Sequence, residues 1–263
     1  MNSRPPQPLS VVTSRLRLTD RDAQLLEFAA EHRLVLSAHA QALLGSSQAA
    51  AQRRLGALAA AGLLERRMYF HGRPSCFQIS RPGLAAIDSK LPVPREDLRC
   101  YAHDVGMAWL WLAAHSGSFG AARQIVGERQ MRSADGAADP GAPRYGVRLG
   151  GFGPTGRDRL HYPDLLLVRA DGRRVALELE LSAKGRIRRE GILAAYGAET
   201  RIDAVLYLTD HLGVSRAIRS SARSVGVAGL VQVQALRWDG RRPGAATPRS
   251  RARSREPARV AAP

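Results

Sequence analysis

Three acidic residues have the types and spacing for metal-assisted chemistry. Glu178 and Glu180 lie two positions apart in a stretch where apolar and polar residues alternate as in a β-strand. Because successive side chains of a strand point to opposite faces, both carboxylates are expected on one face. Asp164 opens the preceding apolar run and is expected to join them. Carboxylates suit Mg²⁺, which can activate water for phosphate hydrolysis, so we expect Asp164, Glu178 and Glu180 to be metal ligands and catalytic residues.

A β-hairpin is expected to bring these carboxylates together. The apolar runs over residues 161–168 and 174–182 are separated by Asp171-Gly172, a dipeptide typical of a tight turn. In the second run the alternation places four apolar residues on the face opposite the glutamates: Val175, Leu177, Leu179 and Leu181. Glu178 and Glu180 are therefore expected to share the other face with Ala176 and Ser182.

The surrounding pattern predicts an α/β domain over residues 95–238. Upstream of the hairpin it predicts a helix over residues 97–114, a strand over 123–128 and a surface loop over 133–143, which is rich in Gly, Ala, Pro and Asp. Downstream it predicts helices over residues 184–198 and 214–225, alternating with strands over 203–209 and 230–236. These elements indicate a mixed central sheet.

Basic residues crowd the start of the helix expected after the hairpin. They are Lys184, Arg186, Arg188 and Arg189. A helix N-terminus already carries partial positive charge, so cations there are mildly unfavourable unless an anion lies nearby. DNA phosphate or the acidic cluster would supply that anion, and Lys184 is also a candidate catalytic residue.

The N-terminal third predicts three helices. Thr19 and Asp22 have the spacing of a capping box at the start of the first helix. Residues 37–44 predict a second helix, and Ser46 or Ser47 is expected to cap a third. The expected buried stripe of the third helix consists of Ala51, Leu55 and Leu58.

The opposite face of the third helix is small and polar. It carries Ser46, Gln52 and Arg53, and such a face lets a helix approach base edges while Gln and Arg reach adenine or guanine. A strand, turn and strand follow over residues 62–79, with four more candidate DNA contacts: Arg66, Arg67, His71 and Arg73. This order resembles the winged helix family, which implies a winged helix-turn-helix domain over residues 18–92. An ordinary solvated face of an Ala-rich helix is the alternative interpretation.

Composition favours a polyanionic partner. The 263-residue chain has 40 Lys and Arg against 23 Asp and Glu, a formal net charge of +17, and phosphate contacts release counterions from nucleic acid. A basic protein from an arginine-rich proteome is the alternative. The two cysteines, Cys76 and Cys100, suggest neither a disulfide framework nor a zinc site, and no apolar run is long enough to span a membrane. We expect a cytoplasmic protein with no membrane partner, and disordered ends at residues 1–17 and 239–263.

Pro163-Asp164 followed by Glu178-Leu179-Glu180 resembles the PD-(D/E)xK nuclease superfamily. The resemblance implies a core of a helix, three strands, a helix and a strand. The sequence departs from the family at Glu180, which stands where the catalytic lysine is expected. Some type II restriction endonucleases are similar in carrying Glu there, and Lys184 is a candidate for a migrated lysine. An inactive core reused for binding, or a half-exposed strand with solvated glutamates, is the alternative.

The whole pattern resembles the replication-relaxation family of actinobacterial plasmids and mobile elements. The matching positions are Pro163-Asp164, Asp171-Gly172, Glu178 to Ser182, Lys184 and Tyr196. The resemblance implies a protein of plasmid or mobile-element replication or transfer that binds double-stranded DNA, with dimerisation as an option. A Mg²⁺-dependent endonuclease is the first alternative function. The second is a transcriptional regulator with an apolar ligand cavity in the second domain.

Overall fold

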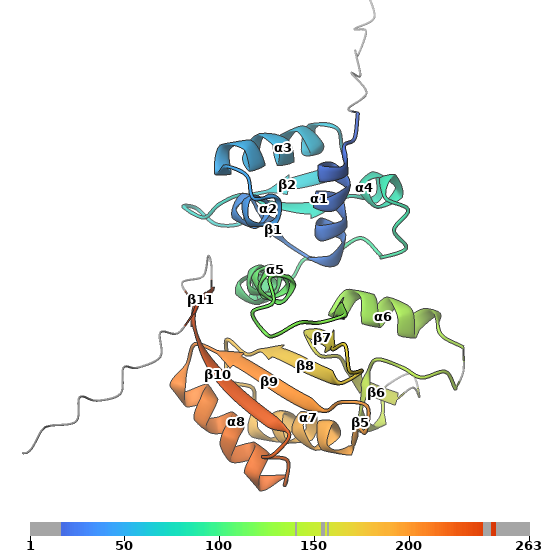
Figure 1. Ribbon diagram of the computed structural model, residues 1–263, viewed down its shortest axis with the longest axis vertical. Coiled ribbons are helices and arrows are strands. Elements are labelled where there is room, and N and C mark those ends of the chain that lie inside the picture. Colours follow the sequence, from blue (N-terminus) through green and yellow to red (C-terminus); the bar gives the residue numbers. More distant parts are fainter. Residues whose placement is uncertain (1–16, 140, 154–155, 157, 239–242, 246–263) are drawn as a thin grey trace, which may run out of the picture.

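The computed structural model describes residues 17–139, 141–153, 156, 158–238 and 243–245 (Figure 1). Helices and strands alternate irregularly along the chain, and its sheets include a mixed central one. The expectation of an α/β protein, α+β overall, is therefore confirmed at this level. The N-terminal elements are α1 (Asp20–Glu31), β1 (Val35–Leu36), α2 (Ser37–Leu44), α3 (Gln48–Ala60), β2 (Leu64–Arg67), β3 (Cys76–Ile79) and α4 (Arg81–Ala86).

The first three helices begin and pack as their sequences predict. At the start of α1 the backbone N–H and the hydroxyl of Thr19 both donate to the Asp22 carboxylate, at 2.7 and 2.6 Å, which confirms the capping box. Helix α2 has the predicted bounds, and Ser47 caps α3 by accepting from the N–H of Ala50. The stripe predicted for α3 is buried, at 1% exposure or less: Ala51, Leu55 and Leu58.

The N-terminal sheet has the order β1-β3-β2 and is antiparallel throughout. Strands β2 and β3 form the predicted hairpin, and α1, α2 and α3 contribute to the same hydrophobic core as the buried residues of this sheet. The hairpin residues between the two strands are exposed, apart from the partly buried Tyr69 and Ser75. This part of the chain therefore presents α3 and an exposed hairpin beside one core.

The second part of the chain is built on a six-stranded sheet of order β11-β10-β9-β8-β7-β4. Strands β8, β9 and β10 are parallel, while β4, β7 and β11 run antiparallel to their neighbours. The elements are a 3₁₀ helix (Leu98–Cys100), α5 (Tyr101–His115), β4 (Gln124–Gly127), α6 (Glu128–Ala137), β5 (Val147–Phe152), β6 (Asp158–His161), β7 (Leu165–Val168), β8 (Arg174–Leu179), α7 (Arg186–Ala198), β9 (Ala204–Thr209), α8 (Leu212–Ser224), β10 (Val231–Trp238) and β11 (Pro243–Ala245).

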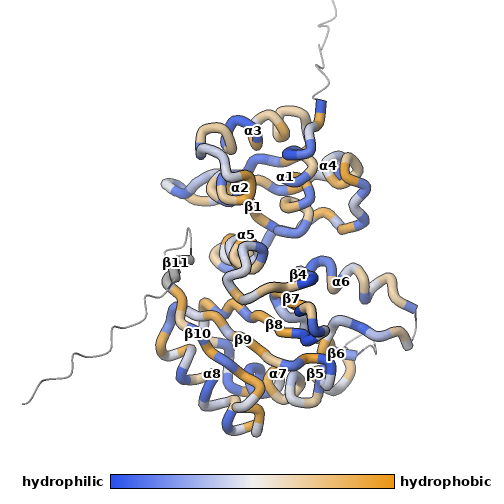
Figure 2. Tube along the Cα trace, viewed as in Figure 1, coloured by the Kyte–Doolittle hydropathy of each residue, from blue (hydrophilic) through white to orange (hydrophobic). Residues whose placement is uncertain are grey.

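Helices cover both faces of this sheet, whose strands are largely apolar (Figures 1 and 2). Helices α7 and α8 share a core with Leu166 and Ala176, and α5 shares the opposite core with Leu167 and Leu177. The predicted alternation along β8 is thus correct. Both faces of the strand are nevertheless buried, so its alternation separates two cores and not a core from solvent.

Helix α5 belongs to the cores of both parts of the chain, and Figure 1 shows it between the N-terminal elements and the central sheet. Val105, Ala108 and Trp109 pack with N-terminal residues, whereas Leu110 and Ala114 pack against the sheet. One apolar helix therefore joins the two predicted domains.

The predicted loop over residues 133–143 is wrong in its first half, because α6 continues to Ala137. Met131 and Asp135 are buried on one side of α6, and Asp135 accepts hydrogen bonds from the N–H groups of Tyr145 and Gly146. Tertiary contacts thus hold a helix whose Ser, Ala, Gly and Asp content predicts a loop. The hairpin of β5 and β6 is a further element that the sequence pattern did not predict.

The predicted disordered tail over residues 239–263 is also wrong at three positions, since Pro243–Ala245 form β11 against β10. The rest of that tail, and residues 1–16 of the predicted N-terminal lead-in, lie outside the described residues. Cys76 and Cys100 are both free thiols. In the part of the chain that the structure describes, no helix combines the length and the apolar character needed to cross a membrane.

Replacing Asp22 with Asn should destabilise the fold. Burial would raise the pKa of Asp22, but hydrogen bonds from Arg54 and Thr19 lower it from 3.8 to about 2. We expect Asp22→Asn to lower the free energy of unfolding by about 1–3 kcal/mol at pH 7 in urea titrations. The contribution should be complete above about pH 4 and be lost as the pH falls through about 2. Asp20→Asn, at an exposed position of the same helix, is the control, and an equal loss in both variants would contradict the assignment.

Candidate functional site

Three carboxylates meet where β7 begins and β8 ends. The two strands are antiparallel and pair Leu165 with Leu177, so the residue before β7 lies beside the end of β8. The backbone N–H of Leu179 donates to the Asp164 carboxylate at 2.7 Å. Glu178 and Glu180 are 2% and 6% exposed, and the Asp164 side chain is 13% exposed. The predicted grouping of these residues is therefore present, in a largely buried position.

Each of the three carboxylates has a different partner within the protein. The His103 imidazole on α5 lies 3.2 Å from Asp164. His161 Nε2, at the end of β6, lies 2.6 Å from Glu178, which also accepts a hydrogen bond from the Tyr196 hydroxyl on α7. Lys184 forms an ion pair with Glu180. Four separate segments of the chain thus supply the partners of one acidic cluster.

These pairings set the charge states of the cluster. Burial would raise the pKa of Asp164, but the adjacent His103 imidazolium and the Leu179 N–H hold it below its usual range. Burial would lower the pKa of His103, but the carboxylates of Asp164 and Asp104 raise it to about 10. At neutral pH His103 is therefore a cation that donates to Asp164.

The surroundings of the cluster also shift the pKa values of Glu180, Lys184 and Tyr196. Burial raises the pKa of Glu180 even though Lys184 opposes the shift. Burial would lower the pKa of Lys184, but Glu178 and Glu180 raise it. Burial also raises the pKa of the Tyr196 phenol, which therefore stays protonated and donates to Glu178. The cluster is accordingly a compact set of opposed charges and hydrogen bonds.

The acidic cluster continues into the N-terminal part of the chain through Arg33. Its guanidinium lies 3.3 Å from Asp104 and 3.0 Å from Glu128. Asp104 in turn lies 3.9 Å from Nδ1 of His103, the residue that holds Asp164. A chain of charged side chains therefore links the loop after α1 to the end of β8.

The donor set matches Mg²⁺ in type, because three carboxylates share one environment. Asp164, Glu178 and Glu180 all act electrostatically on Lys184. In the described ranges, however, no set of three or more His, Cys, Asp or Glu side chains is arranged as a metal site. The carboxylates are engaged by His103, His161 and Lys184 instead, so the magnesium site remains a prediction.

The residues predicted to contact DNA from α3 are accessible. Gln52 and Arg53 are exposed, and Ser46 is partly exposed at the start of the helix. No carboxylate in the described part of the chain pairs with Arg53, whereas its neighbour Arg54 points inward to Asp22. The exposed face of α3 therefore carries the Arg53 guanidinium, which has no ion-pair partner among the described residues.

The basic residues of the β2–β3 hairpin are also exposed, and they differ in their hydrogen-bond and ion-pair partners. Arg66 donates to Ser75, and Arg67 forms ion pairs with Glu65 and Glu96. His71 and Arg73 lie at the exposed turn between β2 and β3. Within the described residues, no carboxylate pairs with Arg66, His71 or Arg73. These side chains are therefore free of ion pairs that would compete with a ligand.

The basic residues at the start of α7 divide into an outward and an inward group. Arg188 is exposed, and Arg186 is exposed beside its ion-pair partner Glu190. Arg189 is partly buried and donates to the Ser221 hydroxyl and to the carbonyl oxygen of Lys184. Arg189 thus fixes the segment that carries Lys184.

Two residues of the cluster were not predicted to have a role at the site. They are His103 and His161, and neither position has a distinguishing spacing in the sequence. Their contacts depend on how α5 and β6 pack against the sheet.

Comparison with protein-family models, with curated proteins and with solved structures gave no match for this chain. The geometry of the site therefore carries the functional argument.

Replacing His103 with Gln should produce a pH-dependent loss of stability. The pKa of His103 is raised from 6.5 to about 10, so its contribution is complete below pH 6.5 and is lost as the pH rises towards 10. We expect His103→Gln to lower the free energy of unfolding by about 1.5–3 kcal/mol at pH 6, and less at each higher pH. His71→Gln, at an exposed site, is the control in the same urea titrations. A deficit in His103→Gln that does not change with pH would contradict the proposed charge.

Proposed function

We propose that this protein binds duplex DNA through α3 and the β2–β3 hairpin. The observation that carries the proposal is the order α1-β1-α2-α3-β2-β3 around one core. In this order α3, which has an exposed polar face, comes directly before an exposed cationic hairpin. A winged helix places its recognition helix in the major groove in this manner. The order of elements and their exposure support that comparison.

Side-chain chemistry on these two elements supports the same function. Gln52 and Arg53 can form bidentate contacts with adenine and guanine edges. Arg66 and Arg73 on the hairpin suit phosphate or the minor groove, and the net charge of +17 favours a polyanion. The sequence pattern from Pro163 to Tyr196 supports a role in the replication or transfer of a plasmid or mobile element.

Removing both side chains from the exposed face of α3 should weaken DNA binding. We expect Gln52→Ala with Arg53→Ala to raise the Kd for specific duplex DNA by about 30-fold or more, because each of the two base contacts contributes about 1–3 kcal/mol. Fluorescence anisotropy with duplexes selected from a random library measures the change. Gln124→Ala with Arg173→Ala removes the same residue types from exposed positions of the second part and is the matched control. Equal affinities for the two double variants would refute the role of α3.

A metal-dependent endonuclease is a second candidate, favoured by the grouping of Asp164, Glu178, Glu180 and Lys184. The order α5-β4-β7-β8-α7-β9 follows the helix, three strands, helix and strand of the PD-(D/E)xK core, with α6 and the β5–β6 hairpin inserted. Strands β7 and β8 carry the carboxylates at adjacent ends. These positions support the comparison with that superfamily.

In this candidate function Asp164, Glu178 and Glu180 would hold Mg²⁺. The ion supplies charge neutralisation for phosphate and lowers the pKa of a bound water. The protein's own groups orient the ligands: His103 and the Leu179 N–H hold Asp164, while His161 and Tyr196 hold Glu178. Lys184, which forms an ion pair with Glu180, would orient the attacking water.

Cleavage of supercoiled plasmid tests the nuclease candidate. We expect nicking or linearisation with Mg²⁺ or Mn²⁺, and none with chelator. Asp164→Asn and Glu178→Gln should each reduce the rate at least 100-fold while DNA affinity stays within about twofold, because neither residue lies on α3 or the hairpin. Asp171→Asn, in the exposed β7–β8 turn, should cleave at the wild-type rate. DNA binding without metal-dependent cleavage by the wild-type protein would leave only the binding function.

A further inference from the structure

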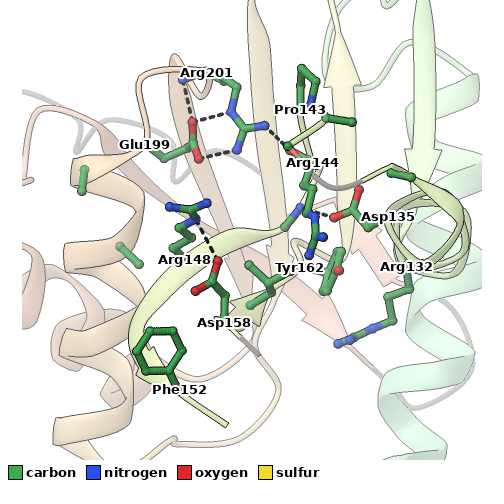
Figure 3. Close-up of a pocket in the computed structure, with 18 of the residues that line it drawn as sticks. Arg132, Asp135, Pro143, Arg144, Arg148, Phe152, Asp158, Tyr162, Glu199 and Arg201 are labelled. Atoms are coloured by element: carbon green, nitrogen blue, oxygen red, sulfur yellow. Dashed lines mark hydrogen bonds and ion pairs between the residues drawn. The ribbon is translucent and has the colours of Figure 1, made fainter. Parts of the chain in front are cut away.

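A cavity of about 1300 Å³ lies beside the β5–β6 hairpin, bordered by α6 and by the end of α7 (Figure 3). It shares no lining residue with the acidic cluster, and neither α3 nor the β2–β3 hairpin reaches it. A ligand-sensing domain was expected to have an apolar cavity. This cavity is instead lined by four arginines, Arg132, Arg144, Arg148 and Arg201, together with three acidic residues.

Two of the three acidic residues are fully engaged in holding the walls. Asp135 accepts from the N–H groups of Tyr145 and Gly146, at 2.8 and 2.9 Å. Glu199 accepts two hydrogen bonds from the Arg201 guanidinium, at 2.7 and 2.6 Å, and a third from the Arg201 backbone N–H at 3.0 Å. Glu199 is thus paired with Arg201, whereas Asp135 keeps its negative charge beside Arg144 and Tyr162 (Figure 3). Arg201 is committed as well, because it also donates to the carbonyl oxygen of Arg144.

The other three arginines give the cavity its positive character. Arg144 is partly buried, and no carboxylate of the described chain forms an ion pair with it. Arg132 lies with its guanidinium carbon 4.3 Å from the centre of the Tyr162 ring and pairs with Glu128 outside the cavity. Arg148 pairs at 3.2 Å with Asp158, and its side chain is 79% exposed, so water and a ligand can compete for it.

Arg132 and Arg144 are close enough to act on one group. Burial and the nearby Asp135 carboxylate raise the pKa of the Tyr162 phenol to about 12, and both guanidinium groups oppose this shift, so all of these charges lie near the phenol. Figure 3 shows Arg144 and Tyr162 side by side in the cavity, with Asp135 next to them. A partly buried guanidinium is stabilised by anions around it, and a phosphate in the cavity would add to the carboxylate of Asp135 beside these arginines.

We propose that this cavity binds a phosphate-bearing ligand, with Arg132 and Arg144 contacting the phosphate and Arg148 closing the open side. Arginine presents planar, paired donors that match phosphate oxygens. The volume admits a molecule of nucleotide size. The same phosphate chemistry occurs in a free nucleotide and in a nucleic acid strand, and the site is separate from the proposed duplex-binding surface.

Isothermal titration calorimetry on the full chain tests the proposal, using pyrophosphate, ADP and a short single-stranded oligonucleotide as separate probes. We expect Arg144→Met and Arg132→Met each to weaken binding at least tenfold, and Arg144→Lys to weaken it less. Arg173→Met removes an exposed arginine of the β7–β8 turn and is the matched control. Binding of ADP identifies a free nucleotide site, whereas binding of the oligonucleotide alone identifies a strand site.

The variant Gln52→Ala with Arg53→Ala separates this proposal from duplex binding, because it should bind the preferred probe with wild-type affinity. Circular dichroism of each variant identifies any that fails to fold, and Arg148→Met then replaces it, since that exposed side chain is not part of the core. Absence of binding to all three probes at millimolar concentration would overturn the proposal. Equal affinities of wild-type, Arg144→Met and Arg148→Met proteins would overturn it as well.

Discussion

The central constraint on this fold is the burial of three carboxylates at the junction of β7 and β8. A buried charge is costly unless it is paired and hydrogen-bonded, and removing one partner of such a pair costs several kcal/mol. The partners here come from α5, the end of β6, the segment after β8 and α7. Those four segments must therefore be in place together, which makes the polar cluster a requirement for the packing of the apolar layers around it.

The same network gives the N-terminal part a physical connection to the cluster. Arg33 bridges Asp104 and Glu128, and Arg129 donates to the carbonyl oxygen of Ala30 at the end of α1. Beside these contacts, the partly buried Glu31 accepts a hydrogen bond from Gln130, and desolvation raises the pKa of Glu31 to about 7. The interface between the two parts is thus polar and charged next to the apolar packing of α5.

Much of this arrangement follows from local patterns, and the rest depends on contacts between distant residues. Period-two alternation placed Glu178 and Glu180 on one face, and helical periodicity identified the buried side of α3. Alternation alone did not reveal that both faces of β8 are buried, because burial depends on α5 and α7. The pairing of His103 with Asp164 joins residues 61 positions apart, which no local spacing encodes. Helix α6 escaped prediction because its stability depends on tertiary contacts through Met131 and Asp135.

Helix α5 contributes opposite faces to two cores, and this has a consequence for the integrity of the molecule. Separating the chain after residue 92 would expose Val105 and Trp109 on one fragment and the N-terminal residues that cover them, such as Leu34 and Leu36, on the other. Each piece would then show an aggregation-prone apolar surface. We therefore expect the two halves to unfold together, without release of a stable N-terminal fragment by limited proteolysis.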